Sequence, residues 1–244
     1  MGVFVAIGLN EWMRIIGFAK NPFNTQYFIL VILLLFATIG LMQHPWAIGL
    51  LLIASVIWWT IQLLDLSSYH GETGYHQNDL LKNLWTGIFL LVPTWASLVY
   101  LHQQPDHGPG LVLYLLVLIW TADSGAYFVG RARGKNKLAP LISPGKTREG
   151  AYGAFAASGV VTIIGAIWLE LSFMQFVFFI LLNCLVVVYS IAGDLLESVY
   201  KRKAQIKDSG TLLPGHGGVL DRIDSLMSAS PLFTLGLWVI GIIK

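Results

Sequence analysis

Long apolar stretches constrain the fold of this chain more than any other feature of its sequence. Each is close to the roughly 20 residues that an α-helix needs to cross the hydrocarbon core of a bilayer. Hydrophobic residues make up 56% of the chain and charged residues only 11%, whereas a soluble domain averages about 25% charged. We therefore predict an all-α fold, a polytopic transmembrane helical bundle. The seven predicted spans cover residues 25–42, 45–64, 83–101, 110–130, 150–169, 173–190 and 219–243.

The N-terminal stretch is apolar but too short to span a bilayer. Residues 3–9 are followed by Asn10, Glu11 and Arg14, which end the apolar run well before the length of a spanning helix. Two interpretations stay open, an interfacial helix and the end of a span whose beginning precedes this sequence. We expect Glu11, beside Trp12, to be an interfacial or helix-contact residue.

Cysteine usage excludes two kinds of structural cross-link. Cys184 is the only cysteine, which rules out an intrachain disulfide and a cysteine-based zinc site. It lies within an apolar run, so we expect a small buried hydrophobic residue at this position.

Basic residues are concentrated in the second half of the chain, although the formal net charge is only +2. Such clustering indicates polyanionic partners on one face of the membrane. Besides the C-terminal Lys244, eleven of the 15 Lys and Arg residues follow residue 130, namely Arg131, Arg133, Lys135, Lys137, Lys146, Arg148, Lys201, Arg202, Lys203, Lys207 and Arg222.

Two predicted helices present acidic residues to a glycine-rich loop between them. The last turns of the first helix place Asp194, Glu197 and Lys201 on one face, because these residues are three or four positions apart. Asp221 and Asp224 repeat this spacing at the start of the second helix. The glycines between the helices can adopt positive φ, which lets backbone N–H groups approach an anion closely. The segment therefore predicts a pocket for metal ions and polyphosphate.

A lone carboxylate, Asp123, falls within the predicted 110–130 span. A charged group inside the bilayer costs about 2.5–3.5 kcal/mol on insertion scales, so Asp123 should face the bundle interior and have a partner. A functional role and a structural hydrogen bond to a neighbouring helix both stay open.

The basic loop 131–148 ends in S-P-G-K-T at residues 143–147. A Walker phosphate loop would need glycine where Pro140 stands, and no strand pattern surrounds the segment. Lys146 and the amides of a helix N-terminus remain suited to contacting a phosphate. The alternative is a positively charged cytoplasmic loop without a ligand.

The glycine-rich segment and its flanks resemble a family signature. The pattern S-x-x-K-R, then K-D-S-G, then L-P-G-H-G-G-x-x-D-R-x-D is similar to that of the phosphatidate cytidylyltransferases, also called CDP-diacylglycerol synthases. The resemblance is tight over the second half of the chain, and the first half matches only as a run of hydrophobic spans. The matching residues are Ser198, Lys201, Arg202, Lys207, Asp208, Pro214, His216, Gly217, Gly218, Asp221, Arg222 and Asp224, with looser agreement at residues 123–127, 143–147 and 193–194.

The resemblance implies an enzyme that makes CDP-diacylglycerol and pyrophosphate from CTP and phosphatidate. Carboxylates gathered at one site repel each other unless cations are bound, and Mg²⁺ held by one or two carboxylates and substrate phosphates is the usual solution. His216 either donates to a phosphate or caps the turn. We expect catalytic roles for Asp194, Lys201, Asp221, Arg222 and Asp224; substrate contacts from Ser143, Lys146, Ser198, Arg202, Lys207, His216, Gly217 and Gly218; and Mg²⁺, with a second cation left open, at Asp123, Asp194, Asp221 and Asp224.

The same resemblance sets expectations for partners and location. CTP, phosphatidate and membrane lipids are the expected partners, nucleic acid is not, and a homodimer is left open. We expect one integral-membrane domain over residues 1–244, with hydrophobic spans in 1–101 and the catalytic half in 110–244. The protein should be a multi-pass protein of a bacterial inner membrane, with its active site facing the cytoplasm.

Three other functions compete with this prediction. A CTP-dependent lipid kinase would share the nucleotide and the membrane setting but would transfer the γ-phosphoryl group. A CDP-alcohol phosphotransferase would show D-G-x-x-A-R followed by G-x-x-x-D-x-x-x-D, which this sequence lacks. An ion-coupled transporter would also bury Asp123 and Asp194, but matching halves with broken helices are expected there.

Overall fold

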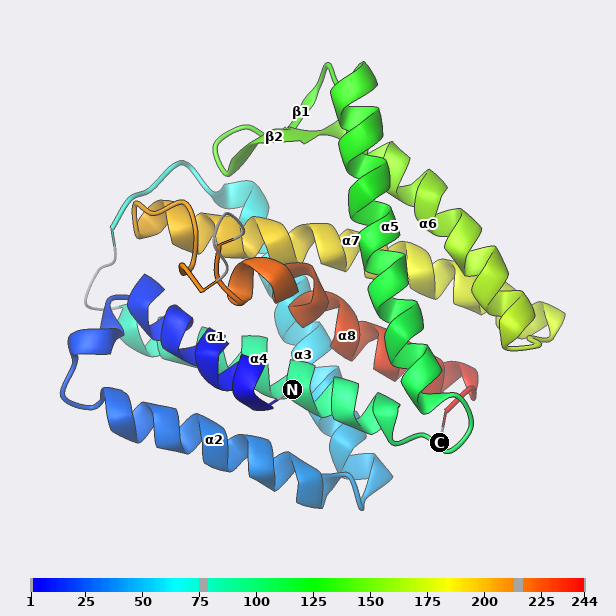
Figure 1. Ribbon diagram of the computed structural model, residues 1–244, viewed down its shortest axis with the longest axis horizontal. Coiled ribbons are helices and arrows are strands. Elements are labelled where there is room, and N and C mark those ends of the chain that lie inside the picture. Colours follow the sequence, from blue (N-terminus) through cyan, green and yellow to red (C-terminus); the bar gives the residue numbers. More distant parts are fainter. Residues whose placement is uncertain (1, 75–78, 213–216, 244) are drawn as a thin grey trace.

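The protein is built almost wholly from helices (Figure 1). The computed structural model describes residues 2–74, 79–212 and 217–243. Within these ranges, seven helices are long and apolar enough to cross a membrane. They are α2 (Asn24–Leu41), α3 (Pro45–Asp65), α4 (Leu80–His102), α5 (Gly108–Arg133), α6 (Arg148–Trp168), α7 (Phe173–Lys203) and α8 (Leu220–Ile240). The predicted all-α, polytopic bundle is confirmed, and the chain is an integral, multi-pass membrane protein.

Local sequence signals account for several helix boundaries. Pro45 begins α3, where its fixed φ suits a first turn and its missing N–H costs nothing. Ser172 and Gln175 form a capping box at the start of α7. The hydroxyl of Thr147 accepts the N–H of Gly150 and caps α6.

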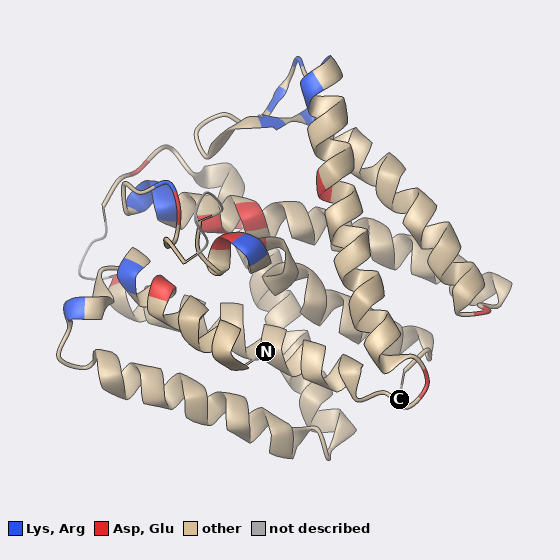
Figure 2. Ribbon diagram, in the orientation of Figure 1, with Lys and Arg blue, Asp and Glu red and all other residues tan. Residues whose placement is uncertain are grey.

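α7 is the longest helix and reaches beyond the apolar layer. Its 31 residues correspond to about 46 Å at 1.5 Å per residue, whereas the hydrocarbon core is roughly 30 Å thick. The helix is continuous through Asp194 and Ser198, as predicted, and its last turns carry its charged residues. Lys and Arg positions gather around the C-terminal end of α7 and in the segment that joins α5 to α6 (Figure 2).

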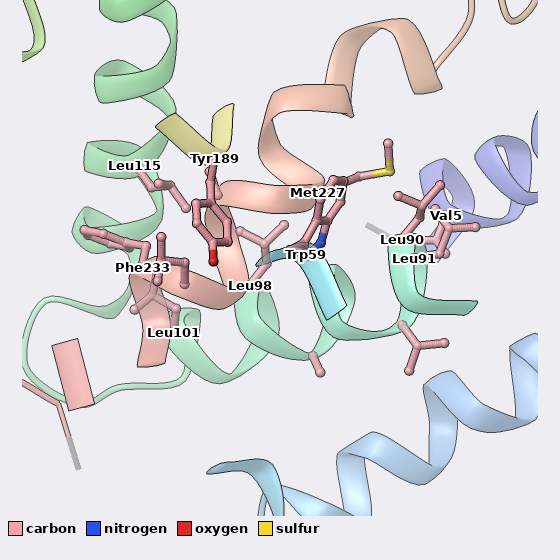
Figure 3. Packing of buried hydrophobic residues seen from close by; sticks show 14 of the residues in the cluster. Val5, Trp59, Leu90, Leu91, Leu98, Leu101, Leu115, Tyr189, Met227 and Phe233 are labelled. Carbon is pink, nitrogen blue, oxygen red and sulfur yellow. The ribbon is translucent and has the colours of Figure 1, made fainter. Parts of the chain in front are cut away.

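One hydrophobic cluster extends through most of the bundle. Figure 3 shows its central part, where side chains of α3, α4, α5, α7 and α8 converge. Trp59 and Phe233 are among its largest fully buried members. The other central residues include Leu90, Leu91, Leu98, Leu101, Leu115, Tyr189 and Met227.

The N-terminal segment forms α1 (Gly2–Ile15) and buries one face inside the bundle. Leu9 and Trp12 are fully buried, and Trp12 Nε1 donates to the carbonyl oxygen of Asn83 in α4 at 3.1 Å. The Trp12 ring also lies 4.6 Å from that of Tyr200 in α7. Glu11 is likewise buried, so its prediction as a helix-contact residue is confirmed.

Two expectations about local structure are wrong. Residues 143–147 do have a strand partner, because β1 (Lys137–Ala139) and β2 (Ser143–Thr147) pair as an antiparallel hairpin. Contacts outside the strands hold this hairpin, since the Glu149 carboxylate accepts the N–H groups of Lys135 and Asn136. The strands themselves show no alternation of apolar and polar residues that would have predicted them. Cys184 is exposed, since an apolar residue of a membrane helix can face acyl chains as readily as the core.

α5 and α6 run side by side (Figure 1) and cross at two glycines. A Cβ added to Gly153 would lie 2.5 Å from the carbonyl oxygen of Gly125, and one added to Gly125 would lie 2.5 Å from that of Gly153. Small residues at this crossing therefore let the two helix backbones approach closely.

Gly153→Ala and Gly159→Ala should change stability in opposite directions, although both lie on α6. At Gly153 the methyl group meets backbone, so overpacking should cost about 1–3 kcal/mol. Nothing lies within 4 Å of a Cβ at Gly159, so alanine there should gain up to about 1 kcal/mol of helix propensity. Thermal unfolding in detergent measures both variants. Equal melting temperatures would contradict the close crossing.

Candidate active site

The site begins where α7 and α8 cross. A Cβ at Gly193 would overlap the backbone carbonyl oxygen of Asp224 and lie 2.5 Å from Ser228 Oγ. Ser228 Oγ in turn donates to the carbonyl oxygen of Tyr189 at 2.6 Å. Because Gly193 has no side chain, the helices approach closely and bring Asp194 beside the turn that carries Asp224.

Lys201 joins the two helices through a pair of carboxylates. Its Nζ lies 2.8 Å from Glu197 Oε2 on α7 and 2.6 Å from Asp221 Oδ1 on α8. The three side chains are 14%, 1% and 8% exposed, respectively. Three charges removed from water to this degree are stable only as a paired group.

The remaining oxygen of Asp221 is saturated by the segment that precedes α8. Asp221 Oδ2 accepts the N–H of Ser209 at 2.8 Å, the Ser209 hydroxyl at 2.9 Å and the N–H of Gly218 at 2.7 Å. Gly217 adopts φ 82°, a conformation that favours glycine. Asp221 therefore organises the glycine-rich loop, and Gly218, predicted to contact phosphate, donates its N–H to Asp221 here.

α1 contributes a third acidic residue, Glu11, to the start of α8. Glu11 Oε1 accepts the N–H of Val219 at 3.0 Å, and Oε2 accepts the N–H of Leu220 at 2.9 Å and the Ser209 hydroxyl at 3.1 Å. A carboxylate in this position satisfies unpaired N–H groups of the helix N-terminus and complements its positive dipole end.

A cavity of about 500 Å³ lies beside this crossing, between α5, the β1–β2 hairpin, α6 and α7. Lys146 Nζ lies 2.6 Å from Asp194 Oδ2, and Ser198 Oγ donates to Asp194 Oδ1 at 3.3 Å. Asp123 lines the same cavity, where Lys146 attracts it and Asp194 repels it; its side chain is exposed, so the expectation that it faces the bundle interior is wrong. The cavity-lining residues include Asp123, Tyr127, Arg131, Ser143, Lys146 and Asp194.

The predicted site residues thus fall into two neighbouring groups. The first group, Asp123, Ser143, Lys146 and Asp194, lines the cavity, and Ser198 is bonded to Asp194. The second group, Lys201, Gly217, Gly218 and Asp221, organises the loop. Asp224 stands between them, since it interacts electrostatically with Asp194, Lys146 and Lys201. Arg202 Nε donates to the carbonyl oxygen of Ile142 at 3.3 Å, and Lys207 and Arg222 are exposed. His216 lies outside the described residues.

The oxygen donors fit a hard cation such as Mg²⁺ only together with a ligand. In the described ranges, no three Asp, Glu, His or Cys residues are grouped closely enough to hold a metal ion by themselves. Mg²⁺ in proteins is commonly held by one or two carboxylates and by substrate phosphates. Asp194 and Asp224 can supply the carboxylates. Glu197 Oε1 is buried without a hydrogen-bond partner among the described residues, a further oxygen for a nearby cation.

Several residues of the site were missed from the sequence. Ser209 lies in the K-D-S-G motif, so the motif itself was an available signal. Glu11 carried a weaker one, because an acidic residue within an apolar helix is costly unless it has partners. Tyr127 and Arg131 follow Asp123 by one and two helical turns and so line the same cavity.

Fold and site together define a multi-pass membrane protein whose charged pocket suits phosphorylated substrates. Comparison with known proteins agrees. The profile described as "Cytidylyltransferase family" matches residues 1–240. The chain is 42% identical over 241 residues to the phosphatidate cytidylyltransferase of Pseudomonas aeruginosa, covering 99% of this chain and 87% of that protein. It is 38% identical over 259 residues to that of Haemophilus influenzae, covering 96% and 87%, respectively.

A more distant relative shows the same pattern over part of its length. The phosphatidate cytidylyltransferase of Bacillus subtilis is 37% identical over 170 residues, which cover 65% of this chain and 63% of that protein. The chain therefore belongs to the cytidylyltransferase family, and it is a nucleotidyltransferase. The family predicted from the signature is confirmed.

Lys201→Met should be strongly destabilising, because it leaves the buried Glu197 carboxylate and Asp221 Oδ1 without their cation. Breaking a buried ion pair from one side costs about 3–5 kcal/mol. Lys203→Met is the matched control on the same helix: its 3.8 Å contact with the more exposed Glu72 should contribute at most about 1 kcal/mol. Thermal unfolding in detergent compares them. If both variants melt together, the Lys201 bridge does not hold α7 to α8.

Proposed function

We propose that the protein is a phosphatidate cytidylyltransferase, which makes CDP-diacylglycerol and pyrophosphate from CTP and phosphatidate. Two relatives that match this chain over most of their own length are named phosphatidate cytidylyltransferase. The observation that carries the proposal is the cavity in which Lys146 pairs with Asp194 beside Asp123 and Asp224. Cations and carboxylates placed together at the end of a membrane helix suit a reaction between two phosphate-bearing substrates, one of them a lipid.

The reaction requires positioning more than proton transfer. An oxygen of the phosphatidate phosphate forms a bond to the α-phosphorus of CTP, and the bond from that phosphorus to the bridging oxygen of the β-phosphate breaks. Pyrophosphate leaves from the opposite side. The phosphomonoester dianion is already a competent nucleophile at neutral pH, so the protein's task is to align two anions and to offset their repulsion.

The residues divide this task between the substrates. Lys146 can turn from Asp194 to a phosphate without leaving the cavity, and Arg222 would hold the lipid phosphate. Phosphate contacts of CTP are assigned to Ser143, Lys146, Ser198, Lys201, Arg202, Lys207, His216 and Gly217, while Gly218 supports them by holding Asp221.

The acidic residues would hold the divalent cation. Asp194 and Asp224 would bind Mg²⁺, with Asp123 and Glu197 nearby, and Asp221 can join them only by giving up one of its present donors. A bound Mg²⁺ supplies positive charge that offsets the charge of the triphosphate.

Access to the cavity must differ for the two substrates. Moving diacyl chains into water costs about 0.8 kcal/mol per CH₂ group, so phosphatidate has to enter from the bilayer. Tyr127, which lines the cavity, is 57% exposed on α5, and this side is the proposed lipid entrance. CTP would enter from the cytoplasm, on the face of the inner membrane where the basic residues of the hairpin and of α7 gather.

The purified protein should transfer the α-phosphorus of CTP to lipid. With CTP, phosphatidate and Mg²⁺, label from the α-position should appear in the lipid phase, and label from the γ-position in pyrophosphate. Chelation of the divalent cation should stop both. Appearance of γ-label in the lipid would instead identify a CTP-dependent lipid kinase and overturn the proposal.

Lys146→Met should lower kcat/KM for CTP by roughly 10²–10³, the usual effect of removing one group that stabilises transition-state charge. Lys137→Met is its control, because Lys137 lies on the neighbouring strand of the hairpin and is exposed. That variant should stay within about twofold of the wild type. Initial rates at varied CTP measure both. Similar losses would show that Lys146 contributes only general basic charge.

A further inference from the structure

Glu11 lies on α1, about 200 residues from the segments that it contacts. Its side chain is only 4% exposed, and no Lys, Arg or His of the described ranges forms an ion pair with it. Its charge is stabilised instead by two backbone N–H groups at the start of α8 and by the Ser209 hydroxyl. Such hydrogen bonds to a charged acceptor are stronger than neutral ones.

These contacts hold both ends of the glycine-rich segment 209–219. Ser209 is at its beginning and Val219 at its end, and one carboxylate accepts a hydrogen bond from each. A Cβ at Gly210 or at Gly218 would lie 2.5 Å from Glu11 Oε1. The described residues at the two ends of the segment thus pack closely against the Glu11 carboxylate.

The Ser209 hydroxyl connects Glu11 to the site. It lies 3.1 Å from Glu11 Oε2 and 2.9 Å from Asp221 Oδ2. A hydroxyl has one proton and donates to one acceptor at a time, so the two carboxylates share this donor. Whenever the hydroxyl donates to Glu11, Asp221 Oδ2 keeps only its two backbone donors, the N–H groups of Ser209 and Gly218.

We propose that Glu11 is a positioning residue of the active site. It fixes both ends of segment 209–219 and, through the shared Ser209 hydroxyl, holds Asp221 and the first turn of α8 in the position that the site needs to bind CTP. The inference rests on the proposed function for its last step, but the positioning of the segment does not depend on it.

Limited proteolysis tests the positioning without any substrate. Lys207 is exposed two residues before Ser209, so trypsin cleavage after Lys207 reports the order of the segment. Glu11→Gln keeps the shape of the side chain, but the amide has one acceptor oxygen in place of two. One of the two backbone N–H groups at the start of α8 therefore loses its acceptor. In full-length protein in detergent, this variant should be cleaved after Lys207 about tenfold faster, the effect of losing one hydrogen bond to a charged group.

A control separates positioning from general stability. Phe233→Leu removes part of a fully buried ring in the middle of α8 and should lower the melting temperature. It should leave cleavage after Lys207 and the KM for CTP within about twofold of the wild type. If Glu11→Gln lowers the melting temperature but leaves cleavage and KM unchanged, Glu11 is only a structural cap and the proposal fails.

The link through Ser209 has its own test. Glu11→Gln and Ser209→Ala should each raise the KM for CTP about tenfold, and the double variant should raise it by less than the product of the two. Such non-additivity is expected when two residues act through one hydrogen bond. Multiplicative losses would overturn the link. A protein without cytidylyltransferase activity would overturn the proposed function, while the proteolysis comparison would still decide the positioning role.

Discussion

One ammonium group, that of Lys201, holds the functional end of this bundle together. It pairs with Glu197 on its own helix and with Asp221 on α8, and all three side chains are largely withdrawn from water. Lys201 can reach both acids only because α7 and α8 approach closely, and Gly193 permits that approach. The close approach at Gly193 and the Lys201 ion pairs therefore depend on each other. The glycine-rich segment and the cavity both lie beside this crossing.

Acidic groups near the membrane surface are stabilised here in three different ways. Glu11 relies on backbone N–H groups and on a hydroxyl that it shares with Asp221, which in addition pairs with the Lys201 ammonium. Asp194 relies on the Lys146 ammonium, and Asp224 accepts only the N–H of Ser225 among the described residues. Groups held by flexible side chains can exchange partners when a ligand arrives, whereas groups held by backbone cannot do so without refolding a loop. Asp194 and Asp224 are therefore the carboxylates best prepared to meet a cation.

The fold was predictable because its main determinants are local. The predicted spans lie within a few residues of the observed helices, except that α7 continues past residue 190 to Lys203, since the length of an apolar run and the caps at its ends decide where a membrane helix begins and ends. The hairpin at residues 137–147 was missed because Glu149 and a contact from Arg202 hold it, and no alternating pattern marks its strands. Cys184 was misplaced because hydrophobicity does not distinguish a core-facing from a lipid-facing position in a membrane helix.

The sequence by itself determined the class of fold, the family and the helix faces that carry Asp194, Glu197, Lys201, Asp221 and Asp224, because helical periodicity and a motif with constant gaps depend on neighbouring residues alone. Only the tertiary structure decided which of these groups pair. The bonds from Glu11 to Ser209 and Val219 join residues 198 and 208 positions apart, and the pairing of Lys146 with Asp194 depends on how a hairpin lies over α7. Such contacts follow from how helices pack around shared glycines, which no local pattern of apolar and charged residues specifies.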